Sequence, residues 1–178
     1  QLTIEEGTAF GDRYARGKLR NLPPDDTAAD MYQATQEICA RHGMHGYEIS
    51  NHAKPGAESR HNQIYWRYGD YVGIGPGAHG RLTLNGRRFA TETHLAPGAW
   101  LNAVDAGNGE SLRETLTAED AAAEYLMMGM RLSEGLDMVR YAQLSGQEMS
   151  QAKLRDLADL GMVTISGDRL RATDQGRA

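Results

Sequence analysis

The dipeptide Asn85-Gly86 constrains the fold more than any other local feature of this 178-residue chain. It stands between two short strand-like segments, residues 82–84 and 87–90. Asn and Gly tolerate the positive φ angles that a two-residue hairpin turn requires, so the sequence predicts an antiparallel β-ribbon here. The ribbon divides the chain, because the patterns before residue 81 and after residue 116 are of different kinds.

The segment before the ribbon predicts strands with a helix between them. Residues 1–4 alternate polar and apolar side chains. Asp25 or Asp26 can cap a helix in which side chains recur at helical spacing from residue 28 up to Gly43, and residues 47–50 have the pattern of a second strand. Strand, helix and strand in about 50 residues form a right-handed parallel unit, the building block of open sheets and barrels. Residues 71–74 predict a third short strand.

Beyond Thr117 the composition shifts to helix formers. Thr117 and Asp120 have the spacing of a capping box, and an apolar stripe continues from there to Gly135. The elements expected after it are helices over 137–144 and 151–160 and strands over 163–165 and 170–173. Three helices and a terminal hairpin are typical of a winged-helix domain, so the sequence predicts three parts: an α/β part over 1–80, a hairpin and linker over 81–116, and a mainly helical domain over 117–178.

Charge and composition exclude several classes of partner. The net charge of −5 argues against nucleic acid, since phosphate binding needs clustered Lys and Arg. The would-be recognition helix carries Lys153 and Arg155 but also Asp156 and Asp159, so a docking or lid role is favoured over DNA binding. No apolar run reaches the roughly 20 residues of a membrane helix, so stable membrane insertion is not expected.

A single cysteine, Cys39, excludes an internal disulfide framework and any cysteine-based metal cluster supplied by this chain alone. It fits the reducing conditions of the cytoplasm. Because Gln1 lies inside an apparent strand, we expect the chain to be a piece of a longer protein.

The glycines of residues 75–80 formally match a dinucleotide-binding fingerprint. That fingerprint requires a helix after its last glycine, and a hairpin follows here instead, so a pyrophosphate site is not expected. Two explanations remain open: the glycines let a tight turn pass close to a neighbouring segment, or they let a ligand approach the backbone.

His61 and Tyr65 share one face whether their segment is a strand or a helix. Imidazole suits iron, zinc or copper, and an iron porphyrin would gain from packing against Trp66. From the residues alone, however, a packed loop anchor is the favoured role for His61. Glu5, His52 and His79 follow expected strands, whose ends would face the reaction centre of a parallel barrel, but a structural role is favoured for each.

Several strings resemble, in order and spacing, the oxygen-independent coproporphyrinogen III oxidase-like family of radical S-adenosylmethionine proteins. They are residues 1–5 (QLTIE), 47–51 (YEISN), 54–56 (KPG), 61–66 (HNQIYW) and 69–80 (GDYVGIGPGAHG). The string at 61–66 is similar to that of the heme-chaperone branch. The resemblance implies the closing strands of a partial (β/α) barrel followed by the C-terminal domain.

The resemblance also implies cofactors that this chain does not hold. Family members carry a four-iron four-sulfur cluster on a CxxxCxxC motif, and most of their S-adenosylmethionine ligands lie upstream of the matching segment. Neither set is present in this sequence. Radical chemistry is therefore not expected from these residues alone, and whether the protein is an enzyme stays open.

For the site, the resemblance implies that His61 is the axial ligand of a heme iron, with Asn62, Tyr65 and Trp66 around the porphyrin. The first hypothesis is a cytoplasmic heme chaperone that binds heme and delivers it to an acceptor protein. The alternative is an oxygen-independent coproporphyrinogen III oxidase of porphyrin biosynthesis, which decarboxylates two propionates to vinyl groups. The third possibility is a docking module without a ligand.

Overall fold

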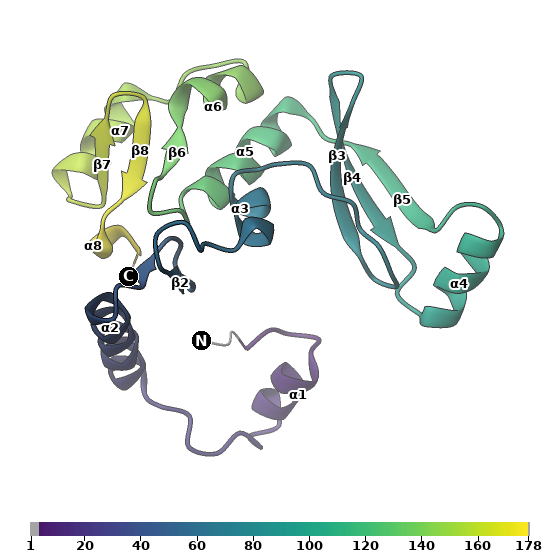
Figure 1. Ribbon diagram of the computed structural model, residues 1–178, viewed down its shortest axis with the longest axis horizontal. Helices are drawn as coiled ribbons and strands as arrows, with labels where there is room; N and C mark the ends of the chain where they lie inside the picture. The colour runs from purple at the N-terminus through teal and green to yellow at the C-terminus, as the bar shows by residue number, and fades with distance from the viewer. Residues whose placement is uncertain (1–3, 178) are drawn as a thin grey trace. The chain divides into compact units, whose positions relative to one another are not determined.

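The structure is a computed structural model that describes residues 4–177. The chain divides into two compact units, one of residues 1–46 and 50–57 and the other of residues 47–49 and 58–178 (Figure 1). No helix in the described range is long and apolar enough to cross a membrane.

The first unit contains two helices and a minimal strand pair. Helix α1 (Ala9–Ala15) begins where the Thr8 side chain accepts a hydrogen bond from the Gly11 amide, and α2 (Asp25–Arg41) follows Pro24. The predicted long helix is therefore confirmed. Strands β1 (His45–Gly46) and β2 (His52–Ala53) pair antiparallel. The strand expected over residues 1–4 lies largely outside the described residues, and Ile4 is not in a strand.

The strand expected over residues 47–50 is wrong. Glu48 makes only an isolated bridge with Leu132, and the Tyr47 carbonyl accepts a hydrogen bond from the Ser133 amide at 3.0 Å. All strand pairs in the described chain are antiparallel, so the parallel unit is not formed there. An alternating pattern indicates an extended segment but does not provide the neighbouring strand that a sheet requires.

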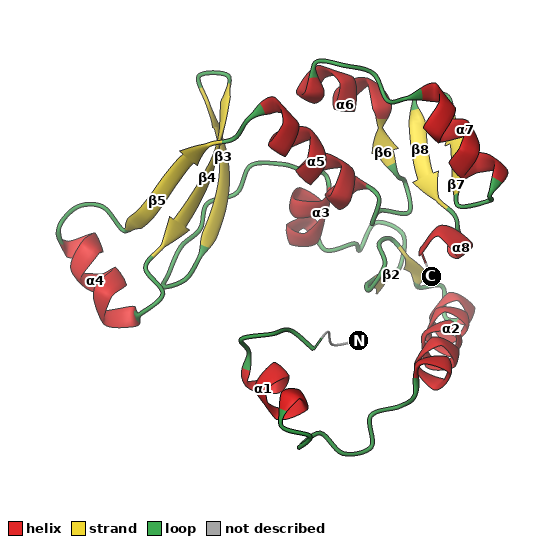
Figure 2. Ribbon diagram, turned by 180° about the vertical axis from the view of Figure 1, so that it is seen from behind, coloured by secondary structure: helices red, strands yellow, loops and turns green. Residues whose placement is uncertain are grey.

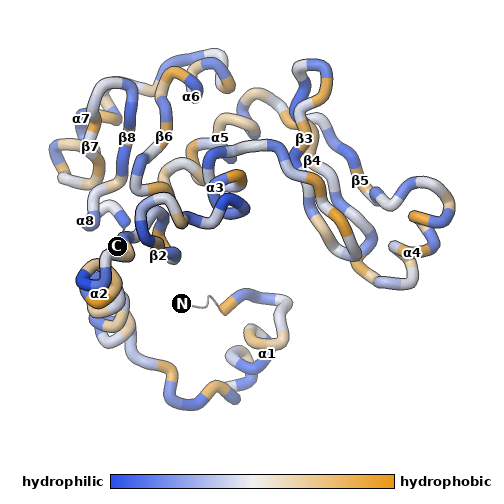
Figure 3. Tube along the Cα trace, in the orientation of Figure 1, coloured by the Kyte–Doolittle hydropathy of each residue, from blue (hydrophilic) through white to orange (hydrophobic). Residues whose placement is uncertain are grey.

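The second unit contains a three-stranded antiparallel sheet in the order β3-β4-β5. Strands β3 (His79–Leu84) and β4 (Arg87–Thr93) are joined by the predicted turn, in which Asn85 has φ +52° and Gly86 has φ +74°. Residues 97–115, expected to be linker, instead form α4 (Pro97–Asp105) and β5 (Glu110–Thr115), and β5 lies beside β4 (Figure 2). The trace of β5 is largely hydrophilic (Figure 3), which is why its sequence resembles a linker.

The remainder of the second unit builds the core. Its elements are α3 (Arg60–Trp66), α5 (Ala118–Gly129), β6 (Leu136–Asp137), α6 (Met138–Ser145), α7 (Gln151–Asp159), β7 (Val163–Ser166), β8 (Arg169–Ala172) and α8 (Asp174–Arg177). The three helices and the hairpin expected after residue 117 are present. A second antiparallel sheet, in the order β6-β8-β7, joins the hairpin to the segment before α6. The core residues are Tyr68, Ala121, Tyr125, Leu136, Leu154, Val163 and Leu170.

Two boundaries differ from the predictions. Helix α5 ends at Gly129 instead of near Gly135, and the chain then turns so that Leu132 bridges to Glu48. Residues 72–74 do not form the expected strand, because only Tyr71 makes a bridge, to Arg81. Isolated bridges of this kind depend on a partner residue far away in the sequence, which local patterns do not reveal.

Candidate functional site

The candidate site lies on α3, a helix of seven residues. It begins where the Ser59 side chain accepts a hydrogen bond from the Asn62 amide at 3.3 Å. It ends at Trp66, after which Tyr68 takes the left-handed conformation with φ +55° and the Gly69 amide donates to the Ile64 carbonyl at 2.7 Å. Left-handed backbone is unusual for a tyrosine, so its surroundings must hold it there.

His61 and Tyr65 are brought together, as the spacing predicts. Their ring centroids lie 4.6 Å apart at an interplanar angle of 73°, an edge-to-face contact. The His61 imidazole is exposed, and within residues 4–177 neither of its nitrogens has a hydrogen-bond partner. Tyr65 also contacts Tyr71, with ring centroids 4.2 Å apart.

Asn62 and Trp66 lie on other sides of the helix. Each helical residue turns by about 100°, so Trp66 is roughly 140° from His61 around the axis. The Arg131 guanidinium lies over the Trp66 ring at 4.3 Å, and the indole Nε1 is buried with no hydrogen-bond partner within the described chain. The Asn62 amide donates to the Tyr47 hydroxyl at 3.0 Å. Both side chains therefore hold α3 on its scaffold.

Arg131 connects the helix to a buried carboxylate. Its Nη2 donates to Oε2 of Glu48 at 3.1 Å, and Glu48 is only 2% exposed. Glu48 and Trp66 thus both contact Arg131. The Glu48 side chain is fully buried, whereas the Arg131 side chain is about one-third exposed, so this ion pair lies at the edge of the core.

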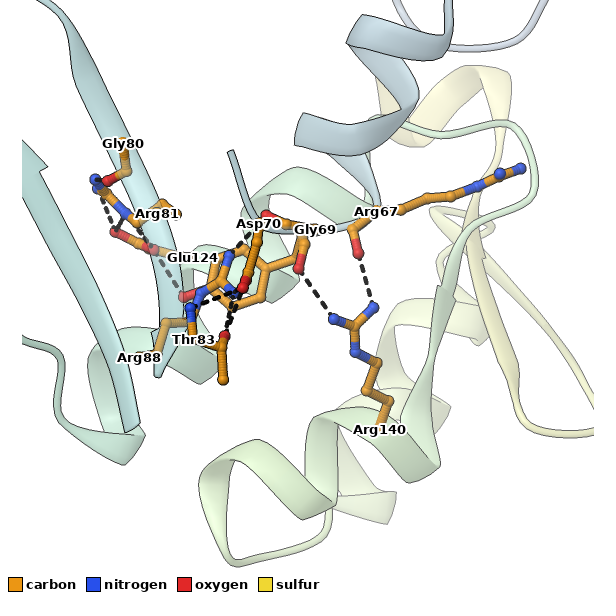
Figure 4. Close-up of polar contacts among 10 residues, drawn as sticks. Arg67, Gly69, Asp70, Gly80, Arg81, Thr83, Arg88, Glu124 and Arg140 are labelled. Carbon is orange, nitrogen blue, oxygen red and sulfur yellow. Dashed lines mark hydrogen bonds and ion pairs between the residues drawn. The ribbon is translucent and has the colours of Figure 1, made fainter. Parts of the chain in front are cut away.

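The turn after α3 is fixed by a polar network around Tyr68, most of which is drawn in Figure 4. The Arg88 guanidinium lies over the Tyr68 ring at 3.7 Å and donates to Asp70 at 2.8 Å and to the Gly69 carbonyl at 3.0 Å. Burial acts to raise the pKa of Asp70, but hydrogen bonds from Thr83 and Arg88 outweigh it, so the pKa of this carboxyl lies below its usual range.

Glu124 links this turn and the β-sheet to α5. Its carboxylate accepts hydrogen bonds from Arg81 Nη2 at 2.8 Å and from the Tyr68 hydroxyl at 2.8 Å. Burial alone would raise the pKa of Glu124, but these bonds outweigh it and hold the pKa below its usual range. Burial raises the pKa of the Tyr68 hydroxyl above its usual range, and the hydrogen bond that this hydroxyl donates to Glu124 raises it further. This network fixes Tyr68 in its left-handed conformation, and no local pattern in the sequence indicates it, because its members lie far apart along the chain.

A further ion pair stabilises the end of α3. Arg67 donates from Nε and Nη2 to the two carboxylate oxygens of Glu134, both at 2.8 Å. These bonds lower the pKa of Glu134 and raise that of Arg67. Arg140 donates to the carbonyls of Arg67 and Tyr68 at 2.7 and 3.0 Å. A pocket of about 350 Å³ adjoins this region and is lined in part by Trp66, Arg67 and Arg140.

Two glycines of residues 73–80, Gly73 and Gly80, allow close packing against neighbouring segments. A Cβ on Gly73 would lie 2.6 Å from the His79 carbonyl oxygen, and one on Gly80 would overlap the Thr91 side chain. The last glycine, Gly80, lies in strand β3, where a dinucleotide-binding fingerprint would require the start of a helix. The explanation that a tight segment passes close to a neighbour is therefore supported by the packing.

The other polar residues that were expected at strand ends occupy separate places. The Glu5 carbonyl accepts hydrogen bonds from Thr8, and His52 Nε2 lies 2.9 Å from the Gln36 side chain. His79 begins β3, with its Nδ1 3.7 Å from Glu92. Nothing in these contacts distinguishes the three as ligands.

The donor set fits an iron that arrives inside a porphyrin. No group of three or more His, Cys, Asp or Glu side chains among the described residues is arranged to hold a bare metal ion. A porphyrin already supplies four nitrogens to its iron, so the protein needs to add only one or two axial ligands. The exposed imidazole of His61, with both nitrogens free of hydrogen bonds within residues 4–177 and an aromatic ring at its side, meets this need.

Comparison with known proteins gives relatives along nearly the whole chain. Heme chaperone HemW of Bacillus subtilis is 34% identical over 181 aligned positions, which cover 99% of this chain and 46% of that protein. HemW of Escherichia coli is 32% identical and covers 99% and 45%. Radical S-adenosyl methionine domain-containing protein 1, mitochondrial, of Danio rerio is 40% identical over 76% of this chain and 32% of its own length. The chain thus spans less than half the length of these relatives.

Fold comparison and domain matching agree with the sequence relatives. Residues 116–178 match the model of the HemN C-terminal domain. The solved structure described as coproporphyrinogen III oxidase (HemN) from Escherichia coli, a radical SAM enzyme, has a TM-score of 0.65 and 19% identity, and covers 92% of this chain and 42% of that one. At that identity the likeness concerns the fold alone. Together with the HemW relatives, these matches assign the chain to the oxygen-independent coproporphyrinogen III oxidase-like radical S-adenosylmethionine family, on its heme-chaperone branch.

Proposed function

We propose that this chain is the heme-binding part of a heme chaperone, with His61 as the axial ligand of the iron. The observation that carries the proposal is the exposed His61 imidazole, whose nitrogens make no hydrogen bond within the described chain and whose ring rests against Tyr65 at 4.6 Å. Relatives at 32–34% identity over 99% of the chain are named heme chaperones, which supports the same function.

The side chains of α3 have different roles in this proposal. His61 supplies a nitrogen, and Tyr65 provides an aromatic edge beside the bound macrocycle. Trp66 and Asn62 fix the helix from its other sides through Arg131 and Tyr47. Because His61 stays solvent-exposed, the bound heme would remain accessible to the acceptor protein to which a chaperone delivers it.

The finer architecture is also part of the proposal. We take residues 1–80 as the closing part of a partial barrel and residues 117–178 as a winged-helix-like domain, in a protein whose remaining part would hold the iron–sulfur cluster and S-adenosylmethionine. The single Cys39 cannot bind such a cluster alone. A reducing, cytoplasmic setting agrees with this one thiol.

Hemin titration tests the proposal. We expect the Soret band to shift and saturate with the wild-type chain and with His94→Ala, an exposed histidine of the same unit. His61→Ala should bind at least about tenfold more weakly, a difference of about 1.4 kcal/mol. Equal binding by all three proteins would contradict the assignment.

The alternative function is anaerobic decarboxylation of coproporphyrinogen III. The fold likeness to a coproporphyrinogen III oxidase is consistent with it. A product assay on the longer protein, loaded with cluster and S-adenosylmethionine, separates the two functions. Formation of protoporphyrinogen IX would contradict a chaperone function alone, and its absence together with hemin binding would support the chaperone.

A further inference from the structure

Three aromatic rings form a continuous row that leads away from His61. The His61 ring contacts Tyr65, and the Tyr65 ring contacts Tyr71 at a centroid distance of 4.2 Å and an interplanar angle of 54°. Tyr71 lies outside α3, in the segment that precedes β3. The row therefore connects an exposed side chain on a short helix with a residue that is fixed elsewhere in the fold.

The backbone of Tyr71 is held on the edge of β3. Its amide donates to the Arg81 carbonyl at 2.8 Å, and the Arg81 amide donates to the Tyr71 carbonyl at 2.9 Å. A Cβ on Gly80 would lie 3.1 Å from the Tyr71 carbonyl oxygen, so the close approach requires glycine there. Burial raises the pKa of the Tyr71 hydroxyl, in agreement with a half-buried ring.

The strand that holds Tyr71 is itself anchored in the unit. Arg81 pairs with Glu124 on α5 at 2.8 Å, and both side chains are about one-fifth exposed. A rigid path thus runs from α5 through β3 to the Tyr71 ring. By contrast, an isolated helix of seven residues is too short to be stable alone, and an exposed histidine on it has freedom among rotamers.

An edge contact between two aromatic rings favours the side-chain rotamers that keep the contact by about two- to tenfold. Held by Tyr71, the Tyr65 ring restricts His61 to the rotamers that keep the edge contact. A preorganised ligand binds more tightly because less conformational freedom is lost on binding.

We propose that Tyr71 is a positioning residue: its ring holds Tyr65, and through Tyr65 it holds the His61 imidazole in the orientation that binds a porphyrin iron. This inference rests on the proposed function of His61 for its ligand, but its geometric part concerns the ligand-free chain. Tyr71 itself contacts neither the iron nor its axial nitrogen in this account.

The test compares Tyr71→Phe, which keeps the ring, with Tyr71→Leu, which removes it, in the full chain. The matched control is Tyr141→Leu, which removes a half-buried tyrosine of α6 that packs on the core and does not belong to the aromatic row. The first readout is the ¹³C NMR resonance of the His61 imidazole without hemin, assigned by its loss in His61→Ala. The second is the rate at which bound hemin transfers to excess apomyoglobin.

We expect Tyr71→Leu to move the His61 resonance toward its value in a short unstructured peptide and to raise the hemin release rate by about two- to tenfold. Tyr71→Phe and Tyr141→Leu should change neither, even where thermal unfolding shows that Tyr141→Leu is less stable. If Tyr71→Leu does not fold, Tyr71→Met fills the space with a flexible side chain and takes its place.

The outcomes separate the two proposals. An unchanged His61 resonance in the ringless variant would overturn the positioning role, whatever the hemin result. An equal change in Tyr141→Leu would also overturn it, since the effect would then be a general loss of structure. A shifted resonance combined with equal hemin binding by wild type and His61→Ala would support the geometric inference while contradicting the proposed function.

Discussion

Replacing Glu124 with glutamine tests whether the polar network, and not apolar packing alone, joins the β-sheet to α5. The carboxylate accepts from Arg81 Nη2 and from the Tyr68 hydroxyl, each at 2.8 Å. Glutamine has nearly the same shape but no charge, and its amide presents one acceptor oxygen in place of two. Arg81 Nε also donates to the carboxylate, so three donors share its two oxygens. With glutamine at least one of these donors loses its partner, and Arg81 loses its counterion.

The size of the effect follows from burial. A hydrogen bond to a charged group contributes about 1.5–3 kcal/mol, and leaving a buried charge unpaired costs more. Because the Glu124 and Arg81 side chains are 20% and 22% exposed, solvent compensates part of that loss. We expect the free energy of unfolding to fall by about 2 kcal/mol.

Urea denaturation followed by circular dichroism measures this change. With a denaturant slope of about 1–3 kcal/mol per molar, the midpoint should fall by roughly 1 M. Glu148→Gln, an exposed substitution of the same chemistry, should stay within about 0.5 kcal/mol of wild type. If Glu124→Gln behaved like this control, apolar contacts alone would join the sheet to α5 and the reasoning above would be refuted.

Two further predictions follow from the same contacts. The pKa values of Glu124 and Glu134 are lower in the folded chain than the ordinary 4.5, so the unfolded chain binds more protons near that pH. The stabilisation from these two carboxylates should be complete above about pH 5 and lost as the pH falls through the folded pKa values. Thermal unfolding between pH 7 and 3 measures this loss, and a pH-independent melting temperature would contradict it. A Cβ on Gly129 would lie 2.7 Å from Cβ of Leu136, so Gly129→Ala should lower the free energy of unfolding by about 1–3 kcal/mol despite the better helix propensity of alanine. Gly98 in α4 has open space around it, so Gly98→Ala should be neutral or slightly stabilising when both variants are measured by urea denaturation.

Local chemistry predicts much of this fold. The turn at Asn85-Gly86 and the cap at Thr117 lie where their residue types require, because the physical cause of each acts within a few residues. Helix α4 was missed although Pro97 stands in its first turn, a position that favours proline, and the nearby glycines made the segment resemble a linker.

Long-range contacts could not be predicted in the same way. Residues 47–50 have the local pattern of a strand, and nothing near Tyr47 in the sequence indicates that its carbonyl accepts a hydrogen bond from the Ser133 amide instead. The spacing of His61 and Tyr65 predicts their shared face, but the spacing of Trp66 places it on another side, where Arg131 holds it. Arg81 and Glu124 are 43 residues apart, and their pairing follows only from the folded chain.

The central claim is that His61 binds the heme iron, and the vibration between iron and histidine nitrogen tests it most directly. Resonance Raman spectra of the reduced, hemin-loaded chain should show an iron–nitrogen stretch that shifts when the protein is grown with ¹⁵N-labelled histidine. We predict this band in wild type and in His94→Ala, and its loss in His61→Ala. An isotope-sensitive band that persists in His61→Ala would contradict the account.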